Sequence, residues 1–156
     1  MKAKLKRLLA LLSIPKRKLP RRRILITVDL DDPILDDLHR NFVERISRFG
    51  IPLTLFSPNS LRDHREGKTL QTLISFALQK RVRIEVGSHS ITHESLNDLE
   101  IRNIQSIIEQ SISSFQKEGI PVRGFRAPYL SIEPTYRAVL STMNREVLAY
   151  DSSVLF

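Results

Sequence analysis

Two histidines separated by three residues, His89 and His93, are the first candidates for chemistry in this sequence. They follow a short apolar run that ends at Val86. On a helical turn, positions i and i+4 share one face, so two imidazole nitrogens there could reach one cation. A carboxylate from elsewhere in the chain would complete a 2-His-1-carboxylate site. The alternative is a pair of surface or turn histidines, and the choice depends on whether a carboxylate lies at the same end of the fold.

Three aspartates end the first apolar segment after the N-terminal region: Asp29, Asp31 and Asp32. Asp32 precedes a proline and is better explained as a helix N-cap, so we assign Asp31 as the metal carboxylate. Asp31, His89 and His93 then give three ligands and leave positions open for water and substrate, the pattern of a catalytic site. A divalent metal there would acidify a water and polarise a carbonyl, and Asp29 would accept the proton of the attacking water. The chain has no cysteine, so any metal must rest on His, Asp or Glu.

The rest of the chain must place these residues at one edge of a fold. Apolar, β-branched runs predict strands, and apolar residues at helical spacing predict helices between them. The predicted strands are 24–30, 53–56, 82–86, 122–125 and 147–149; the predicted helices are 33–49, 70–79, 99–117 and 134–143; and 57–67 is a predicted polar loop. Gly50 and Gly119 are expected to end two of the helices. Alternating strands and helices predict an α/β fold of parallel βαβ units, either a doubly wound sheet or part of a barrel.

In such folds the chemistry sits at the C-terminal ends of the strands. Nearly every candidate polar group lies at the end of a predicted strand: Asp29 and Asp31 end the first, the histidines follow the third, Arg126 and Tyr129 the fourth, and Asp151 the fifth. We therefore expect them to meet at one rim. Arg126 is expected to pair with Asp29, which would orient that carboxylate and keep it ionised. Taken singly, each acid could equally be a helix cap or part of a surface salt bridge.

These motifs resemble those of the polysaccharide deacetylases, the carbohydrate esterases with a NodB homology domain. Residues 27–32, Thr-Val-Asp-Leu-Asp-Asp, are similar to the first motif in an Asp-x-Asp form, like that of deformylases acting on lipid-linked amino sugars. The stretch from His89 to His93 matches the His-Ser/Thr-x-x-His motif, and residues 126–129 match Arg-x-Pro-Tyr. Residues 150–153 look like the start of the motif whose aspartate, here Asp151, lines the substrate groove.

The resemblance implies a distorted seven-stranded (β/α) barrel, incomplete in this chain. It also implies hydrolysis of an N-acetyl or N-formyl group on an amino sugar or polysaccharide, with a lipid-linked sugar as one option. The implied cofactor is one divalent metal, zinc in preference to cobalt, manganese or iron. The implied roles are general base for Asp29, metal ligand for Asp31, His89 and His93, partner of the base for Arg126, and oxyanion donor for the Tyr129 N–H.

One family motif has no counterpart in the chain. It is a strand with Leu-His whose histidine acts as the general acid, and neither His39 nor His64 is a convincing replacement. We therefore expect a partial deacetylase-like domain at 23–156 that lacks the last strands. Without the histidine, Asp29 or water would protonate the leaving amine, with an expected rate loss of roughly 10²–10⁴. The alternative function is a truncated, poorly active or inactive domain that binds metal and glycan.

The net charge of +8 is concentrated at the N-terminus, where residues 1–23 hold ten Lys and Arg and no acid. The remainder is close to neutral, which argues against a nucleic-acid-binding domain. The tail, residues 1–22, has an apolar run far shorter than the ~20 residues that span a bilayer, and no signal cleavage site. Contact with an anionic membrane surface fits its composition, and a solvated extension is the alternative. We expect a cytoplasmic or membrane-surface location in preference to secretion.

Overall fold

The computed structural model describes residues 25–31, 37–62, 69–97, 99–131, 140, 143 and 147–153. The basic tail, His64, most of the predicted helix at 134–143 and the last three residues lie outside these ranges. Within the described residues, no helix is both long enough and apolar enough to cross a membrane.

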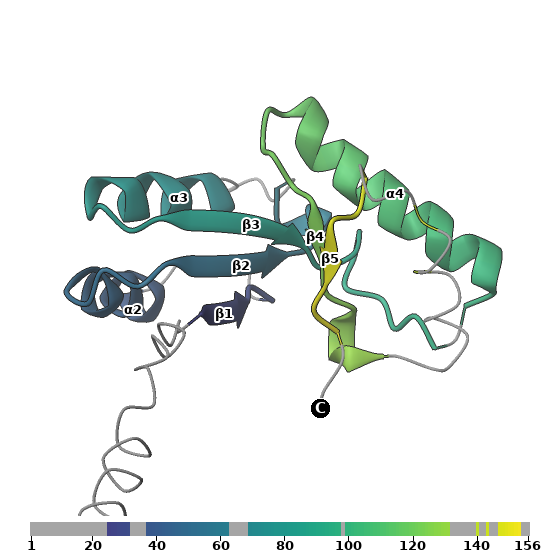
Figure 1. Cartoon of the computed structure of the whole chain (residues 1–156), viewed down its shortest axis with the longest axis horizontal. Helices are drawn as coiled ribbons and strands as arrows, with labels where there is room; N and C mark the ends of the chain where they lie inside the picture. The colour runs from purple at the N-terminus through teal and green to yellow at the C-terminus, as the bar shows by residue number, and fades with distance from the viewer. Residues whose placement is uncertain are drawn as a thin grey trace, which may run out of the picture.

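Five parallel strands form one sheet in the order β1-β2-β3-β4-β5. The strands are β1 (Ile26–Asp29), β2 (Leu53–Ser57), β3 (Ile84–Ser88), β4 (Gly124–Phe125) and β5 (Tyr150–Asp151). Each strand pairs with its neighbour in the sequence, which confirms the predicted parallel βαβ units. The short strands β4 and β5 turn sharply away from β1–β3, so the sheet curls into an incomplete barrel (Figure 1).

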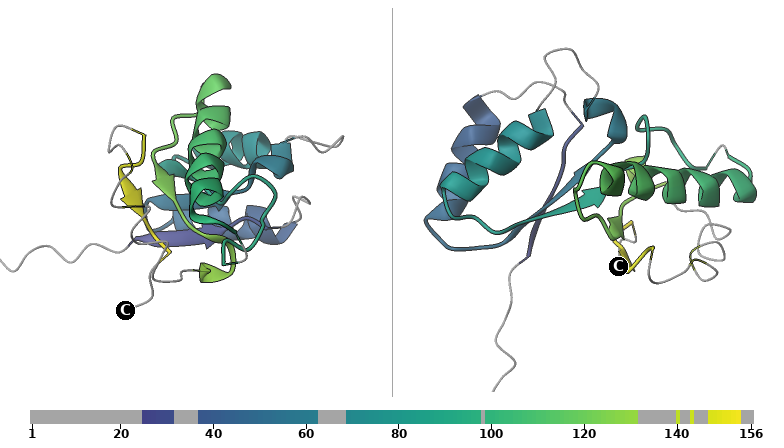
Figure 2. Two further views of the ribbon diagram at one scale, coloured as in Figure 1. Left: turned by 90° about the vertical axis from the view of Figure 1, so that its right-hand side faces the viewer. Right: turned by 90° about the horizontal axis from the view of Figure 1, so that it is seen from above.

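Between the strands, the described residues form three α-helices and two 3-10 turns with bounds as follows. They are α2 (Asp37–Ser47), η1 (Asn59–Arg62), α3 (Thr69–Gln79), α4 (Ile101–Lys117) and η2 (Pro128–Leu130). Gly50 and Gly119 follow α2 and α4 with φ of +61° and +77°, as predicted for glycines that end helices. The turn η1 lies in the stretch predicted as a polar loop. Helices α2 and α3 lie side by side near β1–β3, and the long helix α4 runs beside β4 (Figure 2).

The hydrophobic core lies between the sheet and these helices. On α4, Ile104, Ile108, Ile112 and Phe115 repeat at helical spacing and are all buried. They belong to one buried cluster with side chains of α2, α3 and the strands, including Val43, Leu73, Leu55 and Phe125. The amphipathic pattern of each helix thus fixes which face meets the sheet, and the loops at the strand ends remain available for chemistry.

The fifth strand differs from its sequence prediction, which placed it at 147–149. The structure pairs Gly124 with Tyr150 and Phe125 with Asp151, so the strand begins three residues later. Leu148 is buried in the core instead. The Tyr150 ring occupies the space that a Cβ at Gly124 would need. This fit of ring to glycine sets the register, and it places Asp151 within the strand and not after it.

Candidate active site

The first acids lie at the C-terminal end of β1. Asp29 is the last residue of the strand, and the next residue, Leu30, stays alongside β2 through a hydrogen bond from its N–H to the Phe56 carbonyl at 2.8 Å. Leu30 is fully buried, while Asp29 and Asp31 on either side of it are exposed. The alternation of an extended chain therefore sends both carboxylates toward solvent, away from the core side chain between them.

The two histidines lie in the loop that follows β3. His89 continues the sheet pattern with a hydrogen bond from its N–H to the Ser57 carbonyl at 2.9 Å, and its side chain is only 2% exposed. The loop then turns through positive φ at Ser90 (+78°) and His93 (+65°). The residues between the histidines are not helical, so the helical-turn geometry considered for the pair is wrong. A loop bent at two left-handed residues brings the rings together at 5.0 Å between centroids.

Asp31, His89 and His93 meet at one point of the rim. The Asp31 Oδ1 atom lies 3.5 Å from His89 Nε2 and 3.2 Å from His93 Nε2, and one ligand atom from each residue lies within 4.8 Å of the other two. With metal–ligand bonds of about 2.0–2.2 Å, the ligand atoms of a tetrahedral zinc site lie about 3.4 Å apart, so the three residues fit one divalent ion.

The environment of His89 favours its role as a neutral ligand. Its Nδ1 lies 2.8 Å from the Arg126 carbonyl oxygen, which can only accept, so Nδ1 carries the proton and Nε2 presents its lone pair toward Asp31. Burial lowers the pKa of His89, although the Arg126 carbonyl, Asp29 and Asp31 act in the opposite direction. The hydrogen bond to the Arg126 carbonyl therefore holds the imidazole in the tautomer that presents Nε2 to a metal.

Arg126 connects β4 to the carboxylate at the end of β1. Its Nη1 donates to Asp29 Oδ1 at 2.6 Å, as the sequence predicted, and its Nη2 donates to Thr27 Oγ1 at 2.9 Å. Nη2 also donates to Ser152 Oγ at 2.7 Å, and Nε donates to the Ser152 carbonyl at 3.3 Å. The guanidinium thus joins β1 to the segment after β5, and it holds one oxygen, Oδ1, of the Asp29 carboxylate.

The sequence model that describes the family of polysaccharide deacetylases matches residues 16–148. The chain belongs to this family. Its match includes every strand and helix up to β4, together with the acids of β1, the histidine loop and the Arg126 loop. No curated protein matches the sequence.

Solved structures of deacetylases and related proteins share the fold of this polysaccharide deacetylase family member. A Streptococcus pyogenes deacetylase in complex with acetate has a TM-score of 0.62 at 13% identity, with 90% of this chain and 59% of that chain covered. A chitin deacetylase from the fungus Colletotrichum lindemuthianum has a TM-score of 0.56 at 20% identity, covering 82% and 54%. A carbohydrate esterase family 4 pseudoenzyme from Bacillus anthracis has a TM-score of 0.57 at 15% identity, covering 85% and 43%.

These likenesses confirm the predicted fold, an incomplete (β/α) barrel. The chain spans less than two-thirds of the length of each of these three structures. At identities of 13–20% the likeness concerns the fold, so the site of this family member is judged from its own residues.

The Phe56 ring contacts the Arg126 guanidinium, and Gly87 leaves room for that ring. The Cζ atom of Arg126 lies 4.2 Å from the centroid of the Phe56 ring, in a cation–π contact. Phe56 pairs with Gly87 on the neighbouring strand, and a Cβ at Gly87 would overlap the Phe56 ring. The glycine therefore leaves room for the ring that contacts the guanidinium, a role that the sequence did not reveal.

A buried network of polar side chains holds the histidine loop from below. Ser111 of α4 donates to Asn59 Oδ1 at 2.6 Å and contacts the Ser90 carbonyl at 3.0 Å, and its hydroxyl also meets that of Ser88. The Asn59 N–H donates to the Ser90 carbonyl at 3.1 Å. Ser88, Ser90, Asn59 and Ser111 are all buried. This network fixes the left-handed turn at Ser90, and sequence reasoning missed it because a serine within an apolar helical stripe carries no distinctive signal.

Asp151 and Tyr129 occupy different positions on the rim. Asp151 Oδ1 accepts a hydrogen bond from Ser153 Oγ at 2.7 Å, and the same Oγ accepts one from the Ala127 N–H at 2.7 Å. Through Ser153, Asp151 thus stabilises the loop that carries Arg126, and its role in lining a substrate groove stays a prediction. Tyr129 has φ of +57°, is 73% exposed, and its ring stacks edge-on to His93 with 4.8 Å between centroids.

Proposed function

We propose that this chain is a metal-dependent hydrolase that removes an N-acyl group, acetyl or formyl, from an amino sugar or polysaccharide. The observation that carries the proposal is the double role of Arg126. Its guanidinium holds the candidate base Asp29 at 2.6 Å, and its carbonyl oxygen holds the candidate ligand His89 at 2.8 Å. Arg126 therefore fixes the position of the proton acceptor Asp29 relative to the ligand His89. Hydrolysis of an amide requires the base to be held at a fixed distance from the metal site.

Each residue has a defined part in this proposal. Asp31, His89 and His93 hold one divalent metal, for which zinc suits the nitrogen and oxygen donors. When bound, such an ion supplies Lewis-acid polarisation and acidifies water. Asp29 accepts the proton of the attacking water, and Arg126 keeps that carboxylate oriented. The backbone N–H of Tyr129, in the loop beside His93, is assigned as the donor to the developing oxyanion.

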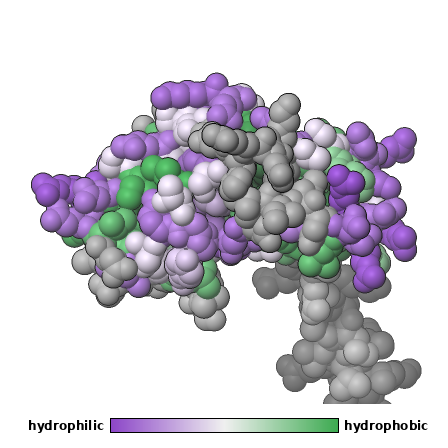
Figure 3. Space-filling view, turned by 180° about the vertical axis from the view of Figure 1, so that it is seen from behind, coloured by the Kyte–Doolittle hydropathy of each residue, from purple (hydrophilic) through white to green (hydrophobic). Residues whose placement is uncertain are grey.

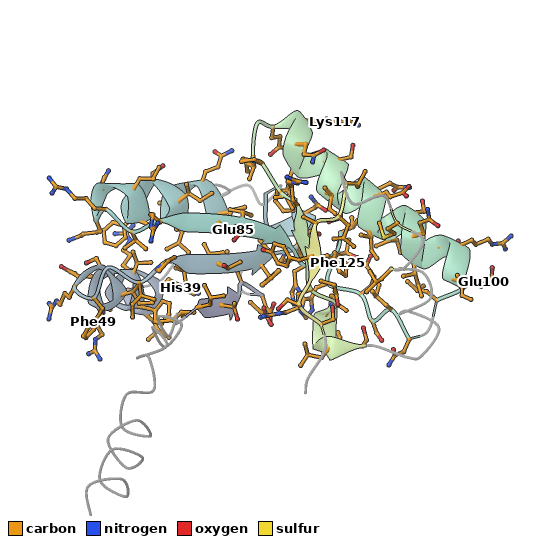
Figure 4. The ribbon with its side chains drawn as sticks, in the orientation of Figure 1. His39, Phe49, Glu85, Glu100, Lys117 and Phe125 are labelled. Carbon is orange, nitrogen blue, oxygen red and sulfur yellow. The ribbon has the colours of Figure 1, made fainter. Side chains whose placement is uncertain are left out.

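The leaving amine needs a proton, and the described residues offer few donors for it. The described histidines are the two proposed ligands and His39, which lies on α2 (Figure 4). We assign the step to Asp29, which carries a proton after it has served as base, so one carboxylate acts in both directions. Because Asp29 alone serves as both general base and general acid, we expect a low rate of acyl release.

A direct test measures acetate or formate release from N-acetyl and N-formyl glucosamine oligomers with zinc-loaded protein. Asp29→Asn keeps the shape of the side chain and can accept hydrogen bonds but no proton. We expect unchanged zinc content and a rate loss of about 10²–10⁴. Release at the wild-type rate from the Asp29→Asn variant would contradict the mechanism.

A second candidate function is a non-catalytic domain that binds metal and glycan. The likeness to the Bacillus anthracis pseudoenzyme favours keeping it, together with the shortage of proton donors near Asp29 among the described residues. The same experiment separates the two functions. If this chain is a non-catalytic domain, the wild type binds zinc through Asp31, His89 and His93, but it releases acyl groups no faster than the Asp29→Asn variant does.

A further inference from the structure

The N-terminal ends of the strands form a second rim, opposite the candidate active site. Two helix-to-strand turns contribute most of it, one between α2 and β2 and one between α3 and β3. We call this surface the basic rim. It consists of Leu25, Arg45, Arg48, Phe49, Leu78, Lys80, Arg81 and Arg83.

Two contacts join the turns of the basic rim into one surface. Lys80 Nζ lies 3.1 Å from Glu44 Oε1, which links the end of α3 to the last turns of α2. The Leu53 N–H donates to the Arg83 carbonyl at 2.9 Å, which holds the start of β2 against the turn before β3. Because all strands are parallel, these turns and the start of β1 at Leu25 lie at the same end of the strands.

Three large apolar side chains of the basic rim lie mainly in water. Leu25 is 72% exposed, Phe49 73% and Leu78 63%. Phe49 projects from the outer end of α2 in Figure 4. The space-filling view in Figure 3, where this edge lies at the right, shows hydrophobic surface interspersed with hydrophilic surface. Exposed leucine and phenylalanine side chains at the same end of the strands offer apolar surface that a partner can cover.

The charge of the basic rim indicates the chemistry of that partner. Residues 45–50 and 80–83 contain five Lys and Arg and no acid. Glu44, the nearest described acid in the sequence, is paired with Lys80. Residues 1–23 add ten cations, and this basic segment ends two positions before Leu25, so it adjoins the basic rim in the sequence. The opposite rim carries the carboxylates of Asp29, Asp31 and Asp151.

We propose that the basic rim binds an anionic phospholipid surface. Cations attract acidic headgroups, and the exposed leucines and phenylalanine can enter the boundary between headgroups and acyl chains. Nucleic acid would use the cations but would gain little from aliphatic side chains such as Leu25 and Leu78. The combination of both kinds of residue at one edge therefore favours lipid.

This orientation has a consequence for the substrate, which rests on the proposed function. The active site lies at the other end of strands of up to five residues, so it would face water roughly 20 Å above the lipid surface, counting about 3.3 Å per residue plus the loops. A glycan that extends away from the membrane could reach it. An amino sugar attached directly to a lipid of the same surface could not.

The first experiment uses the absence of tryptophan from the chain. Phe49→Trp places a single tryptophan on the basic rim, and Ile101→Trp places one at the start of α4, where the native side chain is 52% exposed. On adding vesicles of phosphatidylcholine with about one-third phosphatidylserine, we expect a blue shift of the tryptophan emission for Phe49→Trp and none for Ile101→Trp. Equal shifts in the two variants, or no shift for Phe49→Trp, would overturn the proposal.

The second experiment measures sedimentation of the full chain with the same vesicles. Arg48→Gln with Arg83→Gln is expected to weaken binding about 25-fold, at about fivefold per cation. The matched control, Arg40→Gln with Arg102→Gln, removes two exposed cations outside the basic rim and should bind as the wild type does. Equal binding by both pairs of variants would show that the cations of the basic rim do not contribute and would overturn the proposal.

Two further results distinguish lipid binding from nucleic-acid binding and from catalysis. Phe49→Ser with Leu78→Ser should weaken vesicle binding and leave binding to a short DNA duplex unchanged. If these changes leave vesicle binding intact while the Gln variants weaken DNA binding, the surface is a nucleic-acid site and the proposal is wrong. Asp29→Asn should bind vesicles as the wild type does, because Asp29 lies on the opposite rim. If the chain fails to release acyl groups, the proposed function is wrong but the proposal of lipid binding is not affected.

Discussion

Arg126 and Asp29 are 97 positions apart in the sequence, yet they form an ion pair with Nη1 2.6 Å from Oδ1. The pair connects the end of β1 to the loop after β4. It exists because the sheet curls, since a flat five-stranded sheet would hold β1 and β4 three strand spacings of about 4.8 Å apart. The curvature of the sheet is therefore the feature that assembles the site.

Arg126→Lys should keep a positive charge near Asp29 and still impair catalysis. A lysine ammonium cannot serve Asp29, Thr27 and Ser152 together, because those contacts use the separate nitrogens of a planar guanidinium. We expect a loss of about 10–100-fold in kcat with little change in KM, since Asp29 loses its orientation. Steady-state acyl release measures this. Zinc content is the control, and a variant with wild-type kcat would show that charge alone suffices.

His93→Ala and Asp31→Ala should each reduce zinc affinity sharply, and His89→Ala should reduce it most. His89 is both a ligand candidate and a buried side chain bonded to the Arg126 carbonyl, whereas Asp31 is half exposed. Calorimetric titration with zinc gives the affinities. His39→Ala, on α2, is the matched control and should bind zinc as the wild type does. Equal zinc binding by all four variants would exclude the assigned site.

Zinc should also raise the thermal stability of the wild-type chain. A ligand that binds only the folded state adds about 2.7 kcal/mol at a hundredfold excess over its dissociation constant. We expect differential scanning fluorimetry to show a higher Tm with zinc than with EDTA, and no such difference for His93→Ala. A zinc effect that persists in His93→Ala would place the ion elsewhere.

Much of this site could be predicted because its motif residues lie at the C-terminal ends of strands or directly after them. Asp29, Asp31, His89 and Arg126 come to one rim for that reason, and periodicity was enough to locate most strands and helices. The residues that hold them could not be found in this way. Ser111 reaches Asn59 across 52 positions, and the contact depends on how α4 packs on the sheet. A serine in an apolar helical stripe predicts no partner by itself.

The fifth strand shows the same limit in the fold. Apolar composition favoured 147–149, but the register depends on the Tyr150 ring fitting over Gly124, a tertiary contact that propensity does not contain. The bend of the histidine loop at Ser90 and His93 is another feature that the sequence did not predict. Left-handed conformations of non-glycine residues are stabilised by surrounding hydrogen bonds, and these became visible only with the structure.

Ser111→Val should destabilise the fold and loosen the histidine loop. It would leave Asn59 Oδ1 and the Ser90 carbonyl in a buried place without the hydroxyl that they contact. We expect a loss of about 1–3 kcal/mol in the free energy of unfolding, from urea titration, and weaker zinc binding. Ser75→Ala is the matched control. It removes an exposed hydroxyl bonded to the Gln71 carbonyl and should change stability by no more than about 0.5 kcal/mol.

Tyr150 should make the folded state sensitive to alkaline pH. Burial raises the pKa of its hydroxyl, and the hydrogen bond to Glu85 Oε1 at 2.8 Å with the negative charge of Glu85 raises it further, while Arg126 acts in the opposite direction. In the unfolded chain Tyr150 ionises at about pH 10, so above that pH the unfolded state loses a proton that the folded state keeps. The contribution of Tyr150 to stability is thus complete below about pH 10 and declines as pH rises beyond it. Urea unfolding at several pH values should show a steeper fall for the wild type than for Tyr150→Phe, whereas parallel curves would show that the hydroxyl ionises as freely in the folded chain as in the unfolded one.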